Sequence, residues 1–176
     1  MLRVGMQRAD TGQVTKRPSG GSPGSSPGGF SSRYQRSVTF YTIGYGGRRP
    51  DEFVGLLVEH GVRSLADVRI RPDRASMGAY ARAKSPDKGI EKLLGDRGIE
   101  YHAILELGNL FRDRADWHAP YRALFERTGD LLVGRLDGLP RPFCLMCAEK
   151  RVADCHRLVI AEFLVGSRGW PVHHIE

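Results

Sequence analysis

Residues 38–68 read VTFYTIGYGGRRPDEFVGLLVEHGVRSLADV, and this stretch has the pattern of a strand, a helix and a second strand. Its first six residues are β-branched or aromatic, and they stop at the glycine-rich residues 44–47, as a strand and its turn do. Pro50 suits the first position of a helix, and apolar residues then recur at helical spacing until Gly61. Residues 62–68 form the second expected strand. Two strands joined by a helix pair in parallel, because the connection has to cross over the sheet.

The same alternation continues to the end of the sequence. Ser85 and Pro86 have the pattern of a helix start, and Gly98 that of its stop. Strands are expected over 99–105, 142–147 and 172–175, with helices around 121–132 and 154–166. We therefore expect an α/β fold: a mainly parallel sheet of about five strands with helices on both faces, a Rossmann-like three-layer sandwich. Strand order cannot be read from this pattern.

Residues 1–37 have a different composition from the rest. Residues 18–29 read PSGGSPGSSPGG, which offers no apolar surface to bury. Of the formal net charge of +7, most lies here, because residues 1–36 hold six basic residues and one acid. We expect residues 1–37 to be a disordered, basic Gly/Ser/Pro-rich tail and residues 38–176 to be a single α/β domain.

The composition also bears on the compartment. No apolar run approaches the roughly 18 residues that span a bilayer, and the first ten residues lack the apolar segment of a secretory signal. Three cysteines are an odd number, so reduced thiols are expected rather than a disulfide framework. These features predict a cytoplasmic protein with no membrane partner.

Unusual polar or glycine residues follow every expected strand. In an open parallel sheet, ligands bind at the carboxyl ends of the strands, so these residues are expected to share one site. They are Gly44 and Tyr45, then Asp67, Arg69 and Arg71, then Gly108 and Asn109, then Cys147 and Glu149, and finally His173 and His174. The glycine turn is not a dinucleotide fingerprint, because residues 48–50 occupy the place of the later glycine. A tight turn or a general anion nest fits it instead.

Asp67, Arg69 and Arg71 alternate along a strand and so lie on one face. Asp67 and Arg69 could form a structural ion pair, or Asp67 could orient the guanidinium to bind a phosphate or carboxylate with two hydrogen bonds. Between Arg69 and Lys84 there are five basic residues and one acid. This loop is the domain's strongest candidate for binding an anion.

Cys144 and Cys147 form a C-x-x-C pair, which can indicate a metal or redox site. Residues three apart on a strand point to opposite faces, whereas Cys147 and Glu149 share a face. We therefore expect Cys144 to be a core residue and the protein to hold no stoichiometric metal. His156 and the histidines at 173 and 174 keep a metal site as an alternative.

Cys155, His156 and Arg157 are expected in the first turn of a helix capped by Asp154. The positive end of a helix favours anions and lowers the pKa of a thiol. The turn could hold a phosphate or a reactive Cys155 thiolate. Alternatively, Cys155 is a structural core residue and Arg157 pairs with Glu149.

The chain resembles the domain-of-unknown-function 488 family. The motifs that carry the resemblance are Thr42-Ile-Gly44, Asp67-Val-Arg69, Gly98-Ile-x-Tyr101, Leu107-Gly108, Cys147-x-Glu149, Cys155-His156-Arg157 and His174-Ile175. Ile70 with Arg71, and Asn109, depart from the residues usual in that family. The resemblance implies little about activity, because the family is one of uncharacterised proteins.

The residues themselves predict a site that acts on or binds a phosphate-bearing ligand such as a nucleotide or nucleic acid. They leave open whether the protein is an enzyme; as an enzyme it would be a hydrolase or transferase. Glu149 and His156 would act as acid or base and Cys155 as nucleophile. The expected ligand-binding residues are Gly44, Tyr45, Asp67, Arg69, Arg71, Cys147, Arg157 and His174. No cofactor is expected. Two alternatives are a non-catalytic module that binds nucleic acid or nucleotide, and a metal- or thiol-dependent enzyme using Cys147, Cys155 and His156.

Overall fold

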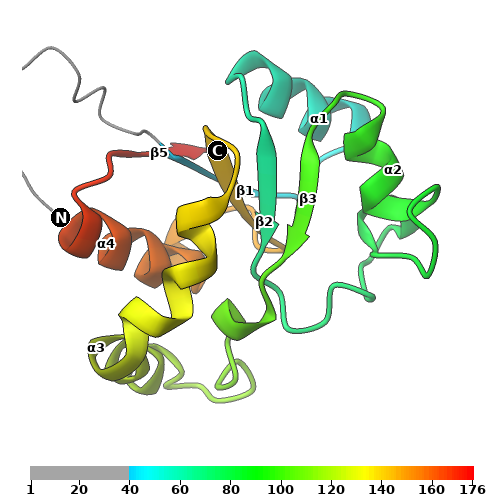
Figure 1. The fold of residues 1–176 in the computed structure, drawn as a ribbon. Helices are drawn as coiled ribbons and strands as arrows, with labels where there is room; N and C mark the ends of the chain where they lie inside the picture. The colour runs from blue at the N-terminus through cyan, green and yellow to red at the C-terminus, as the bar shows by residue number, and fades with distance from the viewer. Residues whose placement is uncertain (1–39) are drawn as a thin grey trace, which may run out of the picture. The chain divides into compact units, whose positions relative to one another are not determined.

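The centre of the fold is a sheet of five parallel strands in the order β3-β2-β4-β1-β5 (Figure 1). The computed structural model describes residues 40–176, so the tail predicted for residues 1–37 lies outside the described residues. The strands are β1 (Phe40–Gly44), β2 (Ser64–Asp67), β3 (Glu100–Ala103), β4 (Phe143–Cys147) and β5 (Val172–Ile175). The predicted parallel sheet of about five strands is confirmed.

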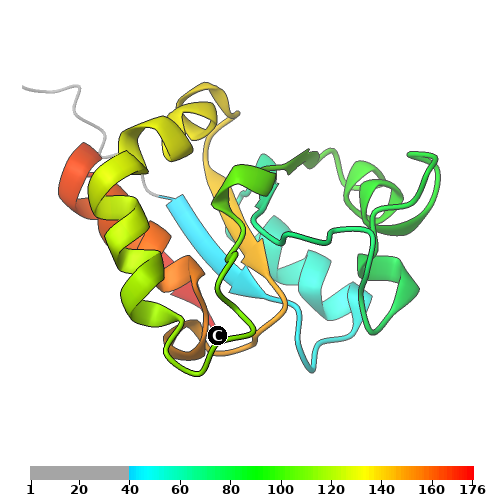
Figure 2. The same ribbon diagram turned by 90° about the horizontal axis from the view of Figure 1, so that it is seen from below.

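Helices cover both faces of this sheet, which gives three layers (Figure 2). The helices are α1 (Pro50–Glu59), α2 (Gly89–Gly95), α3 (His118–Val133) and α4 (Arg157–Arg168). Apolar residues of α1 and α2 form one core against the sheet, and those of α3 and α4 form a second core on the other face. Burial of these two apolar faces supplies the main stabilising free energy, as expected for a layered fold.

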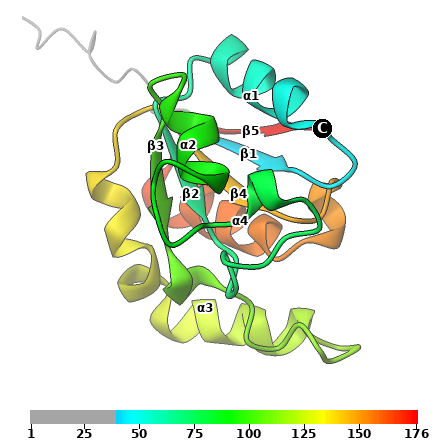
Figure 3. The same cartoon turned by 90° about the vertical axis from the view of Figure 1, so that its right-hand side faces the viewer.

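Strand β4 lies between β1 and β2, although it comes much later in the sequence (Figure 3). Its five residues are all buried, because it has a neighbour on each side and a helical layer on each face. Cys144 belongs to the core under α1 and α2, whereas Cys147 belongs to the core under α3 and α4. The prediction that these two cysteines face opposite sides is confirmed. The strand order differs from the 3-2-1-4-5-6 order of dinucleotide-binding sheets.

Two helices begin later than the sequence predicted. Helix α2 begins at Gly89, because Ser85 donates to the carboxylate of Asp87 instead of capping a helix. Helix α4 begins at Arg157, and the preceding Cys155 has the extended angles φ −130° and ψ 142°. The predicted cap at residue 154 was therefore wrong, and no side chain caps α4. Among residues 40–176 there is no helix with the length and hydropathy that a bilayer crossing requires.

Candidate functional site

The loop that follows β4 is held in place by a buried arginine. Cys147 ends β4, and the chain passes through the short 3-10 helix η4 (Val152–Asp154) before α4 begins at Arg157. The fully buried guanidinium of Arg157 donates to two carbonyl oxygens of this loop, that of Glu149 at 2.6 Å and that of Lys150 at 2.7 Å. The predicted pairing of Arg157 with the Glu149 carboxylate was therefore wrong. The guanidinium binds the backbone, whereas the Glu149 carboxylate accepts hydrogen bonds from the thiols of Cys147 and Cys155.

The glycine-rich turn after β1 supports the same loop from the other side. A Cβ atom on Gly44 would lie 1.8 Å from the carbonyl oxygen of Glu149. At Gly46 it would lie 2.6 Å from the carbonyl oxygen of Ala148. Two backbones can approach this closely only where side chains are absent. Gly44, expected to contact a ligand, instead contacts the protein's own chain.

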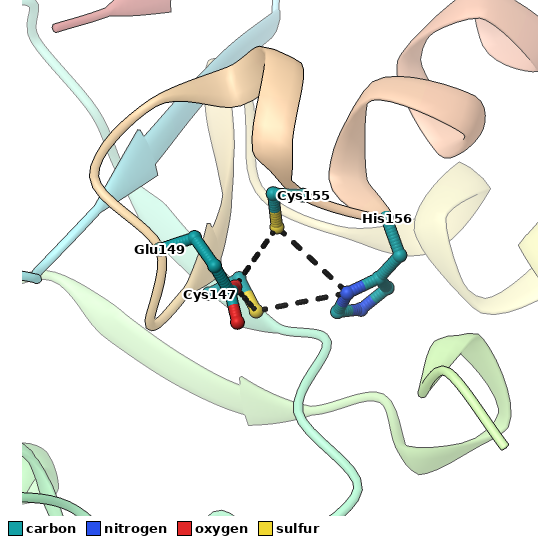
Figure 4. A group of neighbouring side chains, drawn as sticks. All are labelled: Cys147, Glu149, Cys155 and His156. Carbon is teal, nitrogen blue, oxygen red and sulfur yellow. Dashed lines mark hydrogen bonds between the residues drawn. The ribbon is translucent and has the colours of Figure 1, made fainter. Parts of the chain in front are cut away.

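Four side chains with metal-ligating atoms converge at the carboxyl end of β4: Cys147, Glu149, Cys155 and His156 (Figure 4). Their four ligand atoms all lie within 4.8 Å of one another. One carboxylate oxygen of Glu149 lies 2.9 Å from the Cys147 sulfur and 3.1 Å from the Cys155 sulfur. The Nδ1 atom of His156 lies 3.7 Å and 3.8 Å from the same two sulfurs. We call this group the four-donor cluster.

The ring of His156 has a fixed orientation. Its Nε2 atom lies 2.9 Å from the carbonyl oxygen of Val68, the residue that follows β2. A carbonyl oxygen only accepts, so Nε2 carries the proton and donates to it. In the neutral ring, the lone pair is therefore on Nδ1, which faces the two thiols. The side chain is buried, and Tyr121 packs edge-on against the ring.

The two thiols of the cluster differ in acidity. Burial raises the pKa of the Cys155 thiol, but its hydrogen bonds with Cys147 and His156 outweigh burial and lower the pKa to about 6. The hydrogen bond to Cys155, followed by burial, raises the pKa of Cys147 well above its ordinary value. Cys155 is thus the thiol that ionises first. The pKa of the Glu149 carboxyl is lowered, because hydrogen bonds from both thiols outweigh the effect of burial.

A pocket of about 240 Å³ opens directly over the cluster. The cluster forms one part of its lining, and four arginines form another: Arg69, Arg71, Arg74 and Arg112. Trp117 and Tyr45 contribute aromatic surface. The pocket lies at the carboxyl edge of the sheet, where ligands bind in folds of this class.

Asp67 and Arg69 form a buried ion pair behind this pocket. The carboxylate accepts two hydrogen bonds from the guanidinium, at 2.8 and 2.6 Å, and a third from the hydroxyl of Tyr101 at 2.7 Å. The guanidinium also donates to the carbonyl oxygen of Tyr80 at 2.8 Å. Burial lowers the pKa of Arg69, but the hydrogen bond and charge of Asp67 outweigh it, so that the pKa is raised overall. This pair orders the loop after β2, and Asp67 is shielded from the pocket.

The remaining predicted ligand residues divide between the pocket and the rest of the domain. Arg71 lies on the pocket surface and pairs with Asp73 through two hydrogen bonds, at 3.1 and 2.9 Å. Tyr45 also lines the pocket. His174 does not line it, because it lies on the outer strand β5 and hydrogen-bonds the hydroxyl of Thr42 at 2.8 Å.

The lining also includes residues that were not predicted as ligand contacts, among them Arg74, Arg112 and Trp117. Arg74 belongs to the basic loop that the sequence singled out, but it was not named individually. Arg112 and Trp117 lie in the polar segment between β3 and α3. A loop that leaves the carboxyl end of a strand carries some signal, since such loops border the ligand edge. Nothing in the sequence distinguished these two from its other polar residues.

A family model described as Domain of unknown function DUF488 matches residues 49–164. The match spans α1 to α4 and includes both cysteines, the glutamate and the histidine of the four-donor cluster. No curated protein and no solved structure gave a significant match. The chain belongs to the DUF488 family of domains of unknown function.

Proposed function

We propose that the protein is an enzyme that binds a phosphate-bearing small molecule in the arginine-lined pocket and acts on it with the four-donor cluster. The observation that carries this proposal is the juxtaposition of the two groups. One pocket joins four guanidinium groups to two thiols, a carboxylate and an imidazole. Such a set of titratable groups with perturbed pKa values in a concave site is typical of an active centre.

Three of the arginines are suited to hold the anion. Arg71, Arg74 and Arg112 are exposed on the pocket surface, and within residues 40–176 the side chain of Arg74 has no carboxylate partner. The partners of Arg71 and Arg112 are exposed aspartates, and such surface pairs contribute little free energy. A phosphate can therefore replace them. Arg69 forms part of the pocket wall but does not bind the anion, because its guanidinium already donates to Asp67 and Tyr80.

The size and charge of the domain favour a small molecule over a nucleic acid. A volume of about 240 Å³ is below the roughly 300–1,000 Å³ of pockets that enclose drug-sized ligands. Residues 37–176 hold 21 basic and 19 acidic residues, so most of the net positive charge of the chain lies before them. Binding of nucleic acid depends on neutralising many phosphates at once, which a nearly neutral domain does not favour.

Within the cluster, Glu149 is the group placed to exchange protons with a bound ligand. Glu149 is exposed, whereas the other three members of the cluster, Cys147, Cys155 and His156, are buried. The carboxylate thus lies between the pocket and the sulfurs, within hydrogen-bond distance of both thiols. A group that acts as general acid or base has to lie within such reach of the reacting atom.

Calorimetric titration with inorganic phosphate tests the anion site, and turnover of p-nitrophenyl phosphate tests the chemistry. Changing Arg74 or Arg112 to Ala should weaken phosphate binding about tenfold, since a hydrogen bond to a charged group contributes about 1.5–3 kcal/mol. Arg97→Ala is the matched control, because Arg97 is exposed and does not line the pocket. Glu149→Gln should retain phosphate binding and lose turnover.

Equal phosphate affinity in the Arg74→Ala, Arg112→Ala and Arg97→Ala variants would refute the anion site. If phosphate binds through these arginines but no phosphate ester is turned over, the protein is a binding module. Salt-sensitive binding of a single-stranded oligonucleotide, with no binding of phosphate, would favour the nucleic-acid alternative.

A further inference from the structure

The donor set of the four-donor cluster is typical of a zinc site. Thiolate sulfur, imidazole nitrogen and carboxylate oxygen are the ligands that zinc prefers, and four of them complete a tetrahedral shell. Calcium and magnesium prefer oxygen ligands alone, so they do not suit this set. The cysteine pair involved is Cys147 with Cys155, not the C-x-x-C pair. Cys144 lies in the opposite core with no exposed surface.

The spacing of the donors fits one ion. Zinc lies about 2.3 Å from sulfur and about 2.0–2.1 Å from nitrogen, so a tetrahedral shell places donors about 3.6 Å apart. The His156 nitrogen lies 3.7 and 3.8 Å from the two sulfurs. The Glu149 oxygen is closer, at 2.9 and 3.1 Å. Zinc binding therefore requires the exposed Glu149 side chain to move away from the two sulfurs.

The surroundings of the cluster also suit a cation. Metal-bound histidines usually donate their second N–H to a carbonyl or carboxylate, which fixes the ring and directs the lone pair to the metal. His156 makes that contact with Val68. Two thiols and a carboxylate meet here, yet Glu149 forms no ion pair with any residue in the range 40–176. The guanidinium of the nearby Arg157 donates to backbone carbonyls and forms no hydrogen bond with the carboxylate or the thiols.

We propose that Cys147, Cys155, His156 and Glu149 bind one zinc ion. The three buried residues form the fixed part of the shell, and the exposed Glu149 is the exchangeable fourth ligand on the pocket side. Zinc sites with two cysteines, one histidine and an exchangeable fourth position occur in enzymes, whereas structural sites are closed by four permanent ligands. The exchange of Glu149 for a pocket ligand rests on the proposed function. The zinc site itself does not.

Metal binding can be measured without any phosphate ligand. Elemental analysis of the freshly purified full-length chain should find one zinc per chain. After chelation, titration with zinc against a chromophoric indicator should give one site, and cobalt should give the absorption of a tetrahedral ion with thiolate-to-metal charge transfer. Cys147→Ser and Cys155→Ser should each weaken zinc binding about a hundredfold, since structural zinc binding divided among four ligands gives roughly that factor for each. Glu149→Gln should weaken it about tenfold or less.

Cys144→Ala is the matched control, because it removes a buried cysteine three residues from Cys147 and on the opposite face. It should retain the full zinc affinity. Circular dichroism of each metal-free variant separates loss of the site from loss of the fold. Arg74→Ala should also leave zinc binding unchanged, which keeps a failed anion site distinct from a failed metal site.

The proposal is overturned if the folded wild-type chain binds no zinc at micromolar concentration. It is also overturned if Cys144→Ala loses as much affinity as Cys155→Ser, or if the freshly purified protein holds iron in place of zinc. A cobalt spectrum without thiolate charge transfer would remove the two sulfurs from the shell.

Discussion

Changing Arg157 to Ala is expected to lower the free energy of unfolding by about 4 kcal/mol. The guanidinium donates two short hydrogen bonds to backbone carbonyls, at 2.6 and 2.7 Å. Each hydrogen bond to a charged group contributes about 1.5–3 kcal/mol, and the buried methylenes of the stem contribute about 0.8 kcal/mol each. Against this, the change removes a buried cation whose Nε atom has no partner among residues 40–176. An unpaired buried donor costs about 1–3 kcal/mol, so its removal offsets part of the loss and leaves about 4 kcal/mol.

Urea unfolding and thermal melting would measure this loss. For a chain of this length, about 4 kcal/mol corresponds to a fall of roughly 12 °C in Tm. Arg168→Ala is the control on the same helix, because its guanidinium forms only surface ion pairs with Asp130 and Asp137. That change should cost less than about 1 kcal/mol. Arg157→Lys, which keeps the charge but cannot donate to both carbonyls in the same way, should fall between the two. If Arg157→Ala melts within about 3 °C of the wild type, the hydrogen bonds from Arg157 to the carbonyls of Glu149 and Lys150 do not stabilise the fold.

Three further changes probe the scaffold of the site. Gly44→Ala should lower the free energy of unfolding by more than about 2 kcal/mol, because its Cβ would lie 1.8 Å from a backbone carbonyl oxygen. Gly55→Ala is the control: it has open space around it, and the higher helix propensity of Ala should raise stability by up to about 1 kcal/mol in the same melting assay. Asp67→Asn should lower the free energy of unfolding in urea by about 3–5 kcal/mol, since it leaves the buried Arg69 guanidinium without a counter-charge. A loss below about 1 kcal/mol, as for a surface ion pair, would contradict this. Burial and, to a smaller extent, the charge of Arg157 lower the pKa of His174 in the folded protein. The unfolded chain therefore takes up a proton first, near the ordinary histidine pKa of about 6.5, and the wild type should lose stability as the pH falls from there to the lower folded pKa. His174→Gln should lose less stability between pH 7.5 and 5, and equal losses in the two proteins would show that this residue does not contribute.

The sequence predicted the layers of the fold because each layer follows from a local pattern. The apolar runs around Ile43 and Met146, and the helical spacing of Phe53 and Leu57, report directly which residues are buried. The insertion of β4 between β1 and β2 has no such local signal, because it depends on how distant segments pack. The late start of α4 was missed for a related reason. Asp154 ends a short 3-10 helix and Cys155 is extended, so α4 begins at Arg157, and no capping pattern in the sequence indicates this interruption.

The candidate site was predicted in its location and only partly in its members. Strand alternation correctly separated Cys144 from Cys147, and the carboxyl edge of the sheet correctly brought Cys147, Glu149 and His156 together. The sequence also predicted Cys155 at this site, which the structure confirms, but it could not give the contact between Cys155 and Cys147, because this depends on the path of the loop between them. Nor could it show that Arg157 turns inward, since a side chain in a first helical turn can point either way.

The position of β4 has a consequence for the order of events during synthesis. While the ribosome has produced only β1, β2 and β3, the sheet has a gap, because β1 and β2 are not neighbours and each pairs with β4. The strand that fills this gap begins at Phe143, after most of the domain has already emerged. Until then, two apolar strand edges are exposed to other nascent chains, which is a hazard of long-range pairing. Because Cys147 and Cys155 belong to the same late segment, a formed cluster would mark a chain whose sheet is already closed.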